Sequence, residues 1–214
     1  MQLWSHSFND GGYIPGEYAF AVFNPETHVT LSENHNPHVG WGDPPAGTQS
    51  LVLICHDPDV PSRGDDVNQE GKTVPADLPR VDFFHWLLID LPPHAATIEA
   101  GTVSDRVVSR GKSGPEIENT SFPGARHGLN DYTGWFADDA AMSGDYFGYD
   151  GPCPPWNDEV VHRYVFTLYA LDIGRLPVEG KFNGPQVLAA MRGHILAEAA
   201  IVGIYTLNPQ LITY

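Results

Sequence analysis

Short runs of apolar and aromatic residues divide the chain and predict β-strands. Four of them cover residues 18–23 (YAFAVF), 51–55 (LVLIC), 83–91 (FFHWLLIDL) and 163–171 (RYVFTLYAL). Each run is rich in aromatic and β-branched residues and is bounded by Gly, Pro, Asn or Asp, which is typical of strands. A final strand is expected at 201–207 (IVGIYTL). The pattern therefore predicts a mainly β protein.

The run 83–91 is apolar on both of its faces. In strand geometry, alternate positions form two sets: Phe83, His85, Leu87 and Ile89 on one face, and Phe84, Trp86 and Leu88 on the other. A strand needs apolar residues on both sides only when both of its faces are covered. The run 163–171 has the same character, so both are predicted to be central strands.

Residues 184–200 (GPQVLAAMRGHILAEAA) carry the one convincing helical spacing. The apolar positions that fall on one helical face are Val187, Leu188, Met191, Ile195 and Leu196. Pro185 suits the first turn, where a missing N–H costs nothing. We therefore predict a helix here, directly before the final strand.

Three stretches, 24–50, 61–82 and 101–160, have no regular pattern and are expected to be long loops. Loops of this length within one domain are usually functional. The chain has 214 residues, with 22 glycines and 19 prolines, and shows neither an internal repeat nor a linker. We predict a single domain over residues 1–214, built from short strands joined by turns.

The charge of the chain narrows the classes of partner. Lys and Arg total 11 against 27 Asp and Glu, which gives a formal net charge of −16. Nucleic acids and anionic membranes are negatively charged and repel such a protein. We expect no nucleic-acid partner and no stable insertion into a membrane.

Two features bear on location. The cysteines, Cys55 and Cys153, are too few for a disulfide scaffold. The first residues, MQLWSHSFNDGG, lack the basic and apolar regions of a signal peptide, and no apolar run approaches the roughly 18 residues of a spanning helix. We expect a cytoplasmic protein with reduced thiols.

Polar residues lie at the edges of the predicted strands. Asp57 and Asp59 follow the run 51–55, His85 lies within the run 83–91, and His162 and Tyr164 open the next one. If these strands adjoin, one pocket would hold acids, histidines and aromatic side chains, as ligand sites often do. Each residue also has an ordinary structural interpretation. A lone His in a strand is usually a hydrogen-bonded core residue, Asp-Pro is a common turn former, and Cys153 is most simply a small loop residue.

Four ordered motifs carry more information together than apart. They are DPDVPSR (57–63), HW (85–86), YDGPCPP (149–155) and HRYVFTLYALD (162–172). In this order they resemble the phosphatidylethanolamine-binding protein family, above all its bacterial branch of Raf kinase inhibitor-like proteins. The resemblance extends to GLNDYTG (128–134) and to AAMRGHILAEAAIVGIY (189–205).

The resemblance implies a fold and a site. The fold is a two-sheet antiparallel β-sandwich with peripheral helices and a C-terminal helix. The site is a small cavity for phosphate or a phospholipid head group, with no cofactor, and a homodimer is compatible with it. Carried over to this chain, the ligand-binding residues are Asp57, Asp59, Pro61, His85, Gly151, Pro154, Pro155, His162 and Tyr164.

The residue types suit an anion. His85 and His162 can donate N–H groups to it, and backbone N–H groups can add more. Ionised Asp57 and Asp59 would repel an anion, so we expect them to accept hydrogen bonds from histidine or from loop N–H groups and to orient the donors. A protonated carboxyl that donates directly is a rarer alternative.

This chain departs from the family pattern in places. The segment 64–84 between DPDVPSR and HW is long and is expected to add a loop beside the pocket. Phe83 stands where the family often has Trp, and the loop reads GPCPP where other branches have a second Gly. These differences bear on the ligand more than on the fold.

Three functions are compatible with the sequence. The first is a non-enzymatic binding protein for a small anion or phosphorylated head group, with a kinase- or protease-inhibitor-like regulatory role as one form of it. The second is a metal- or Cys-dependent hydrolase that uses Asp57, His85, Cys153 and His162, since His, Asp and thiolate can all bind zinc. The third is an acidic module that binds a basic protein partner. We expect the first, with no catalytic or metal-binding residues.

Overall fold

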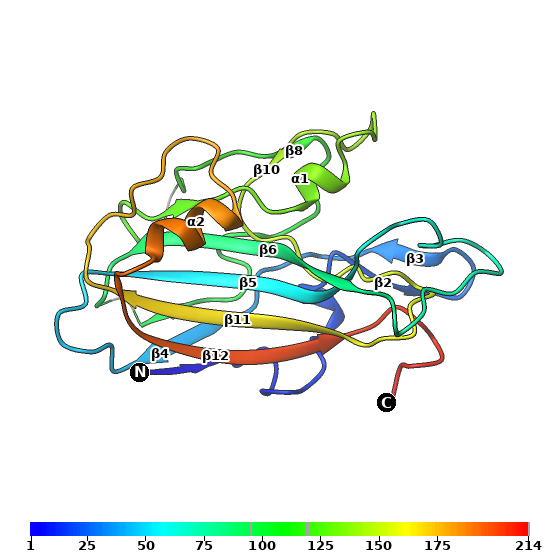
Figure 1. The fold of residues 1–214 in the computed structure, drawn as a ribbon, viewed down its shortest axis with the longest axis horizontal. Helices are drawn as coiled ribbons and strands as arrows, with labels where there is room; N and C mark the ends of the chain where they lie inside the picture. Colours follow the sequence, from blue (N-terminus) through cyan, green and yellow to red (C-terminus); the bar gives the residue numbers. More distant parts are fainter. Residues whose placement is uncertain (95, 119, 214) are drawn as a thin grey trace.

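A five-stranded antiparallel sheet in the order β12-β11-β5-β6-β9 forms the centre of the computed structural model, which describes residues 1–94, 96–118 and 120–213 (Figure 1). Its strands are β5 (Ser50–Pro61), β6 (Arg80–Leu91), β9 (Arg126–His127), β11 (His162–Leu171) and β12 (Ile195–Tyr205). The runs 83–91 and 163–171 lie in β6 and β11, each with a strand on both sides. The prediction that both are central strands is confirmed.

Smaller elements surround this sheet. A three-stranded antiparallel sheet has the order β1-β4-β7, β2 pairs with β3, and β8 lies parallel to β10. These strands are β1 (Gln2–Trp4), β2 (Ala21–Asn24), β3 (His28–Leu31), β4 (Val39–Gly42), β7 (Thr97–Ile98), β8 (Gly111–Lys112) and β10 (Asp145–Tyr146). The helices are the 3-10 turn η1 (Gly16–Tyr18), α1 (Tyr132–Trp135) and α2 (Gly184–Met191). The fold is mainly β with few helices, as predicted.

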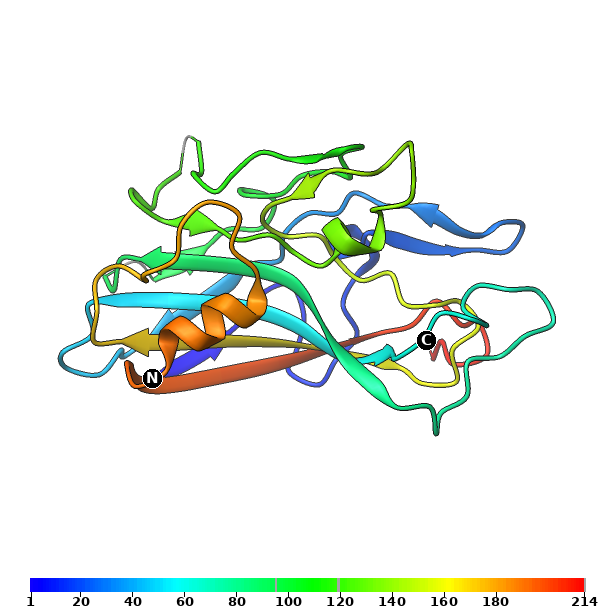
Figure 2. The same ribbon diagram turned by 45° about the horizontal axis from the view of Figure 1, so that its top comes forward.

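Apolar side chains cover both faces of the central sheet. Helix α2 lies over one face (Figure 2). There Val187 and Met191 of α2 belong to the same buried apolar cluster as Ile54 and Leu87. The opposite face packs against the three-stranded sheet through Val39 of β4, among others. Two layers of burial on one sheet explain why the central strands are apolar on both sides.

A bulge in β6 changes the faces that the sequence predicts. Between the pairs Cys55–Trp86 and His56–Phe84, β6 has one additional residue, His85. An extra residue shifts the alternation of side chains that follow it. Phe84 therefore packs on the α2 face, opposite Trp86, and the predicted sharing of a face by Phe84 and Trp86 is wrong.

The predicted helix 184–200 is wrong in its second half. Helix α2 begins with a capping box formed by Asn183 and Gln186 and ends at Met191, and Gly193 then adopts a φ of +83°. From Ile195 onward the chain pairs with β11 along almost the whole of that strand. Cross-strand pairing along an entire central strand outweighs a helical spacing in the local sequence.

Two further boundaries differ from prediction. The stretch 18–23 is not a strand throughout, because η1 covers its start and β2 begins at Ala21. The DPDVP segment is not a turn that follows a strand, because β5 continues to Pro61 with a register shift between Asp57 and Val60. Its prolines are tolerated because β11 pairs with β5 only as far as His56, which leaves that side of the segment without a ladder.

The regions predicted as loops contain short elements of two to four residues. Strands β3 and β4 and helix α1 are examples. Elements this short carry no periodic signal in the sequence. None of the helices among the described residues has the length and apolar character required to cross a membrane.

Candidate functional site

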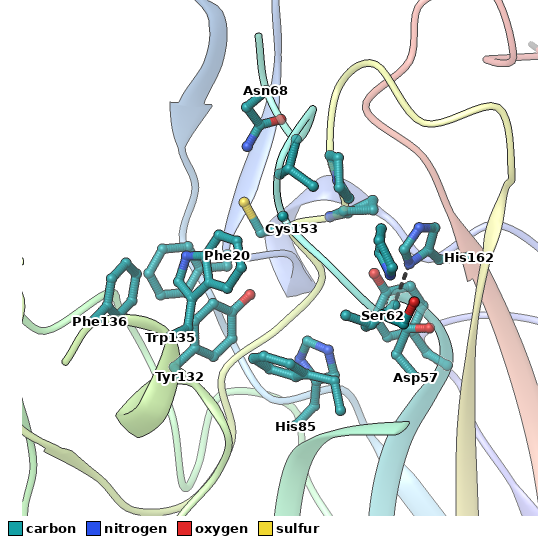
Figure 3. Close-up of a pocket in the computed structure, with 18 of the residues that line it drawn as sticks. Phe20, Asp57, Ser62, Asn68, His85, Tyr132, Trp135, Phe136, Cys153 and His162 are labelled. Atoms are coloured by element: carbon teal, nitrogen blue, oxygen red, sulfur yellow. Dashed lines mark hydrogen bonds and ion pairs between the residues drawn. The ribbon is translucent and has the colours of Figure 1, made fainter. Parts of the chain in front are cut away.

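A cavity of about 390 Å³ lies where β5, β6 and β11 meet the 151–155 loop and α1 (Figure 3). Its lining residues are Phe20, Asp57, Val60, Pro61, Ser62, Arg63, Gly64, Val67, Asn68, Phe83, His85, Tyr132, Trp135, Phe136, Cys153, Pro154, Pro155, His162 and Tyr164. Seven of the nine residues predicted as ligand-binding are therefore brought together, and Asp59 and Gly151 lie outside the lining.

A buried chain of charges closes one side of the cavity. His162 Nδ1 lies 2.6 Å from Asp57 Oδ2, and His162 Nε2 lies 3.0 Å from Asp158 Oδ2. Arg80 holds Asp158 with two further bonds of 2.6 and 3.0 Å. Asp57, Asp158 and His162 are at most 1% exposed. Two acids and two bases leave this group with no net charge.

His162 is an imidazolium that is fully occupied by its neighbours. Ionised carboxylates only accept hydrogen bonds, so both of its ring nitrogens must donate. Burial works against this charge, but the hydrogen bonds that His162 donates to Asp158 and Asp57 raise its pKa to about 9. No ring N–H of His162 is left for a ligand, so the expectation that it donates directly to an anion does not fit this geometry.

The two acids of the DPDVP segment, Asp57 and Asp59, have different hydrogen-bond partners. Asp57 accepts from His162 and also from the backbone N–H of Asp59 at 2.7 Å, as expected of an orienting acid. The Asp59 carboxylate instead accepts from the guanidinium and the backbone N–H of Arg163, at 2.8 to 2.9 Å. Burial opposes ionisation of Asp59, but Arg163 lowers its pKa overall. Asp59 thus ties β5 to the start of β11.

Gly151 allows the 151–155 loop to pass close to the backbone of Tyr18. A Cβ atom at Gly151 would collide with the backbone oxygen of Tyr18, so no other residue fits without movement. The Gly151 carbonyl accepts from the hydroxyl of Tyr132 at 2.7 Å, and its N–H donates to Asn34 at 2.8 Å. The glycine therefore sets the path of the loop that presents Cys153, Pro154 and Pro155 to the cavity.

His85 presents one ring nitrogen to the cavity. Its Nδ1 lies 2.7 Å from the backbone oxygen of Asp150, and because a carbonyl only accepts, Nδ1 carries the proton. Among the described residues, none hydrogen bonds to Nε2. Burial lowers the pKa of His85, although the charge of Asp57 and the bond to Asp150 act the other way. The ring is neutral near pH 7, with Nε2 as an acceptor.

The Asp150 carboxylate fixes the carbonyl that holds His85. It is fully buried and accepts from Asn34 and Asn130 at 2.8 Å each, with Lys112 Nζ at 3.1 Å. Lys112 also donates to the carbonyl of Tyr149. This group of four polar side chains, from four separate segments, positions the base of the cavity.

Replacing Lys112 by methionine is expected to lower the free energy of unfolding by about 2 kcal/mol, because Asp150 loses its cation but keeps two amide donors. Chemical denaturation monitored by circular dichroism measures this change. The matched control is Lys181→Met, which removes an exposed ion pair with Asp145 (2.7 Å) and is expected to cost less than about 1 kcal/mol. Equal effects of the two variants would contradict this role of Lys112.

Tyr164 brings a hydroxyl group to the same end of the cavity. Its ring is 1% exposed and meets the His85 ring edge-on, with centroids 5.1 Å apart. Burial raises the pKa of Tyr164 well above its usual value, so the hydroxyl keeps its proton. This oxygen is buried and has no hydrogen-bond partner among the described residues. Buried polar groups normally have partners, so the position suits a ligand atom.

Sequence reasoning missed most of the apolar lining. The missed aromatic residues are Phe20, Tyr132, Trp135 and Phe136. Three of them belong to or follow α1, a helix of four residues without a periodic signal. The motif GLNDYTG that marks this region was seen only through a family resemblance. The predicted extra loop beside the pocket is confirmed, because Ser62, Arg63, Gly64, Val67 and Asn68 line it.

The loop after β5 is fastened to the 151–160 segment. Asn157 accepts from the Asn68 N–H at 2.9 Å and donates to the backbone oxygens of Asp66 and Lys72, and Asn68 accepts from the Trp156 N–H. The loop that forms this wall of the cavity is therefore held in place by hydrogen bonds to the 151–160 segment.

Comparison with known proteins identifies the family of this chain. A sequence model described as phosphatidylethanolamine-binding protein matches residues 4–206 of the chain. The chain belongs to the phosphatidylethanolamine-binding protein family. A relative in Methanothermobacter thermautotrophicus, a UPF0098 protein, is 34% identical over 96% of this chain and 98% of its own length. The UPF0098 protein YbhB of Escherichia coli is 28% identical over 96% and 100%.

Solved structures of the family share the fold. The Chlamydia trachomatis protein CT736, described as a phosphatidylethanolamine-binding protein (PEBP) homologue, superposes with a TM-score of 0.63 at 29% identity and covers 95% of both chains. Escherichia coli YbcL, described as a member of the mammalian PEBP family, gives a TM-score of 0.67 at 22% identity over 96% of this chain and 97% of its own. The predicted family and fold class are thus confirmed.

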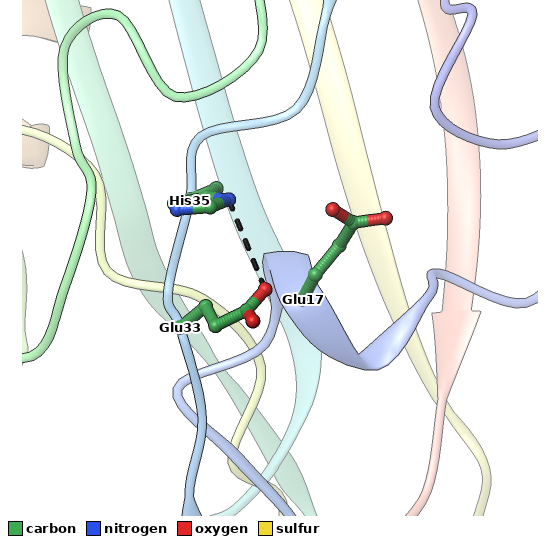
Figure 4. A group of neighbouring side chains, drawn as sticks. All are labelled: Glu17, Glu33 and His35. Atoms are coloured by element: carbon green, nitrogen blue, oxygen red, sulfur yellow. Dashed lines mark ion pairs between the residues drawn. The ribbon is translucent and has the colours of Figure 1, made fainter.

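The metal-dependent form of the hydrolase hypothesis requires a cluster of metal ligands in the cavity. Within the described ranges, the one group of at least three such side chains with ligand atoms within 4.8 Å of one another is Glu17, Glu33 and His35, outside the cavity (Figure 4). His35 and Glu33 are 4.0 Å apart at the surface. Exposed groups of this kind are common without an ion, so this group by itself does not indicate a metal site.

Proposed function

We propose that this protein binds a small anion, such as phosphate or a phosphorylated head group, in the cavity. The observation that carries the proposal is that, among the described residues, neither the buried hydroxyl of Tyr164 nor Nε2 of His85 has a hydrogen-bond partner. Both residues line a cavity that is otherwise largely apolar, and their ring centroids lie 5.1 Å apart. Membership of the phosphatidylethanolamine-binding protein family supports the same ligand class.

The protonation states suggest how an anion is held. Tyr164 donates its O–H to an anionic oxygen, and neutral His85 accepts at Nε2. A singly protonated phosphate matches both, because one of its oxygens accepts while its P–OH donates. The charged group of Asp57 and His162 has no free donor, so its part is to hold β5 and β11 in place around the ligand.

We propose binding rather than catalysis for this site. The Cys-dependent form of the hydrolase alternative needs a reactive thiolate at Cys153, but burial raises the pKa of that thiol to about 12. His162 is bonded at both ring nitrogens and is not available as a base. Neither residue has the form that nucleophilic catalysis requires.

Removing the Tyr164 hydroxyl is expected to weaken anion binding about tenfold, the effect of losing one hydrogen bond to a charged group. The test is isothermal titration of the native protein and of Tyr164→Phe with inorganic phosphate and with O-phosphorylethanolamine. Thermal stability of the variant should be unchanged or higher, because the hydroxyl has no partner to lose.

Tyr205→Phe is the matched control for this experiment. Its hydroxyl is also buried but donates to the Ala21 carbonyl at 2.9 Å, outside the cavity. This variant should lose stability and keep its affinity for phosphate. The proposal fails if the native protein binds neither ligand, or if the two variants weaken binding equally.

A further inference from the structure

The cavity has two chemically different sides. Figure 3 shows Asp57, Ser62 and His162 on one side, with the rings of Phe20, Tyr132, Trp135 and Phe136 on the other and His85 between them. His85, which is proposed above to hold the anion together with Tyr164, lies between these two sides. A bare phosphate has no atom that could contact the aromatic side.

The aromatic side is a connected set of rings. Tyr132 lies stacked near Phe20 and Phe136, with centroid separations of 4.6 and 5.6 Å, and meets Phe83 edge-on at 5.2 Å. Trp135 also lines the cavity but is 55% exposed, which is unusual for so large an apolar side chain. We refer to Phe20, Tyr132, Trp135 and Phe136 as the aromatic wall.

Helix α1 is held firmly enough to serve as a binding surface. At its start, the Asp131 carboxylate accepts from the backbone N–H of Phe84 in β6 at 2.7 Å. At its first residue, the hydroxyl of Tyr132 donates to the Gly151 carbonyl at 2.7 Å. The aromatic wall is thus tied both to the strand that carries His85 and to the loop opposite. A preformed surface costs little ordering when a ligand binds.

The two sides are close enough for one small molecule to reach both. The Tyr132 centroid lies 5.6 Å from that of His85 and 5.6 Å from that of Phe136. A phosphate at the polar end and a ring attached through one ester oxygen would span this distance. The cavity volume of about 390 Å³ also exceeds what a bare phosphate fills and lies in the range of small-molecule sites.

We propose that the ligand is a phosphate monoester of an aromatic group, with its phosphate at Tyr164 and His85 and its ring against the aromatic wall. This inference rests on the proposed function of the cavity and adds the chemical class of the substituent. A flat ring would cover Trp135 and pack offset or edge-on against its neighbours, as aromatic pairs prefer.

The first test compares three ligands on the native protein by isothermal titration: inorganic phosphate, n-propyl phosphate and phenyl phosphate. Phenyl phosphate is expected to bind about tenfold tighter than inorganic phosphate, because it buries its ring and gains aromatic contacts. n-Propyl phosphate should fall between them. Equal affinity for the propyl and phenyl esters would overturn the requirement for an aromatic group.

The second test removes the exposed part of the wall. Trp135→Ala should abolish most of the preference for phenyl phosphate and leave the affinity for inorganic phosphate within about twofold, since the ring contact is lost and the polar end is unchanged. Leu31→Ala is the matched control, because Leu31 is 62% exposed and lies outside the cavity. A preference for phenyl phosphate that persists in Trp135→Ala would overturn the placement of the ring.

The possible results distinguish recognition of an aromatic substituent from binding of the anion itself. If all three ligands bind equally and depend on Tyr164, the aromatic substituent is excluded and anion binding stands. If none of them binds the native protein, both fail together. The result that supports both is tight binding of phenyl phosphate that is weakened by Tyr164→Phe and by Trp135→Ala.

Discussion

The protein is expected to lose about 3 kcal/mol of its free energy of unfolding as the pH rises from 6.5 to 9.5, because His162 then releases its proton. The pKa of this residue is raised from 6.5 to about 9 in the folded state. In that interval the folded chain holds a proton that the unfolded chain has lost. The stabilisation is therefore complete below about pH 6.5 and disappears as the pH passes about 9.

Urea denaturation at a series of pH values measures this loss. The variant His162→Gln removes the charged partner of Asp57 and leaves Asp158 with Arg80 alone, and it is expected to be less stable by about 3 kcal/mol at pH 6.5, with a flatter profile above it. His194→Gln is the control, since His194 pairs with Asp172 at the surface (2.8 Å) and its loss should leave the slope intact. A native profile that is flat between pH 6.5 and 9.5 would contradict a charged, doubly bonded His162.

Replacing His85 by alanine is expected to weaken binding of O-phosphorylethanolamine about a hundredfold, because the ligand loses a strong partner in a buried site. His85 is 3% exposed, so the same change also leaves the Asp150 carbonyl without its donor and lowers stability by about 2 kcal/mol. Affinity and stability would then change together, and a second variant is needed to separate them.

His85→Asn provides that separation. An asparagine amide can donate to the Asp150 carbonyl in place of Nδ1 but has no group at the position of Nε2. This variant should therefore keep most of the native stability and still lose binding, as judged by thermal unfolding and isothermal titration side by side. If His85→Asn binds the ligand as tightly as the native protein, then Nε2 does not contact it and His85 is a core residue.

Local sequence predicted the central strands because burial on both faces leaves an unmistakable apolar run. It failed at the junction of α2 and β12, where Leu188, Ile195 and Leu196 follow helical spacing yet are exposed. There the long antiparallel pairing with β11 decides the structure, and pairing partners far apart in the chain leave no local signal. The bulge at His85 escaped prediction for the same reason, since a register shift depends on the partner strand.

For the site, the ordered motifs located the right segments but not the roles of their residues. The roles depend on pairs such as Asp57 and His162, which are 105 residues apart in sequence and in contact in the fold. Whether His162 faces a ligand or two carboxylates cannot be decided without knowing where Asp158 lies. Asp150 and Lys112 were missed because their function is to hold a backbone carbonyl, which no residue pattern marks.

The sequence by itself determined that the chain is mainly β, and the order of its four motifs indicated the phosphatidylethanolamine-binding proteins, because burial and motif order are properties of the chain. Only the tertiary structure decided that His162 is fully paired, that the Tyr164 hydroxyl and His85 Nε2 have no partner among the described residues, and that α1 adds an aromatic wall. Those outcomes depend on which side chains meet across the fold, and distance in space is what sequence order does not contain.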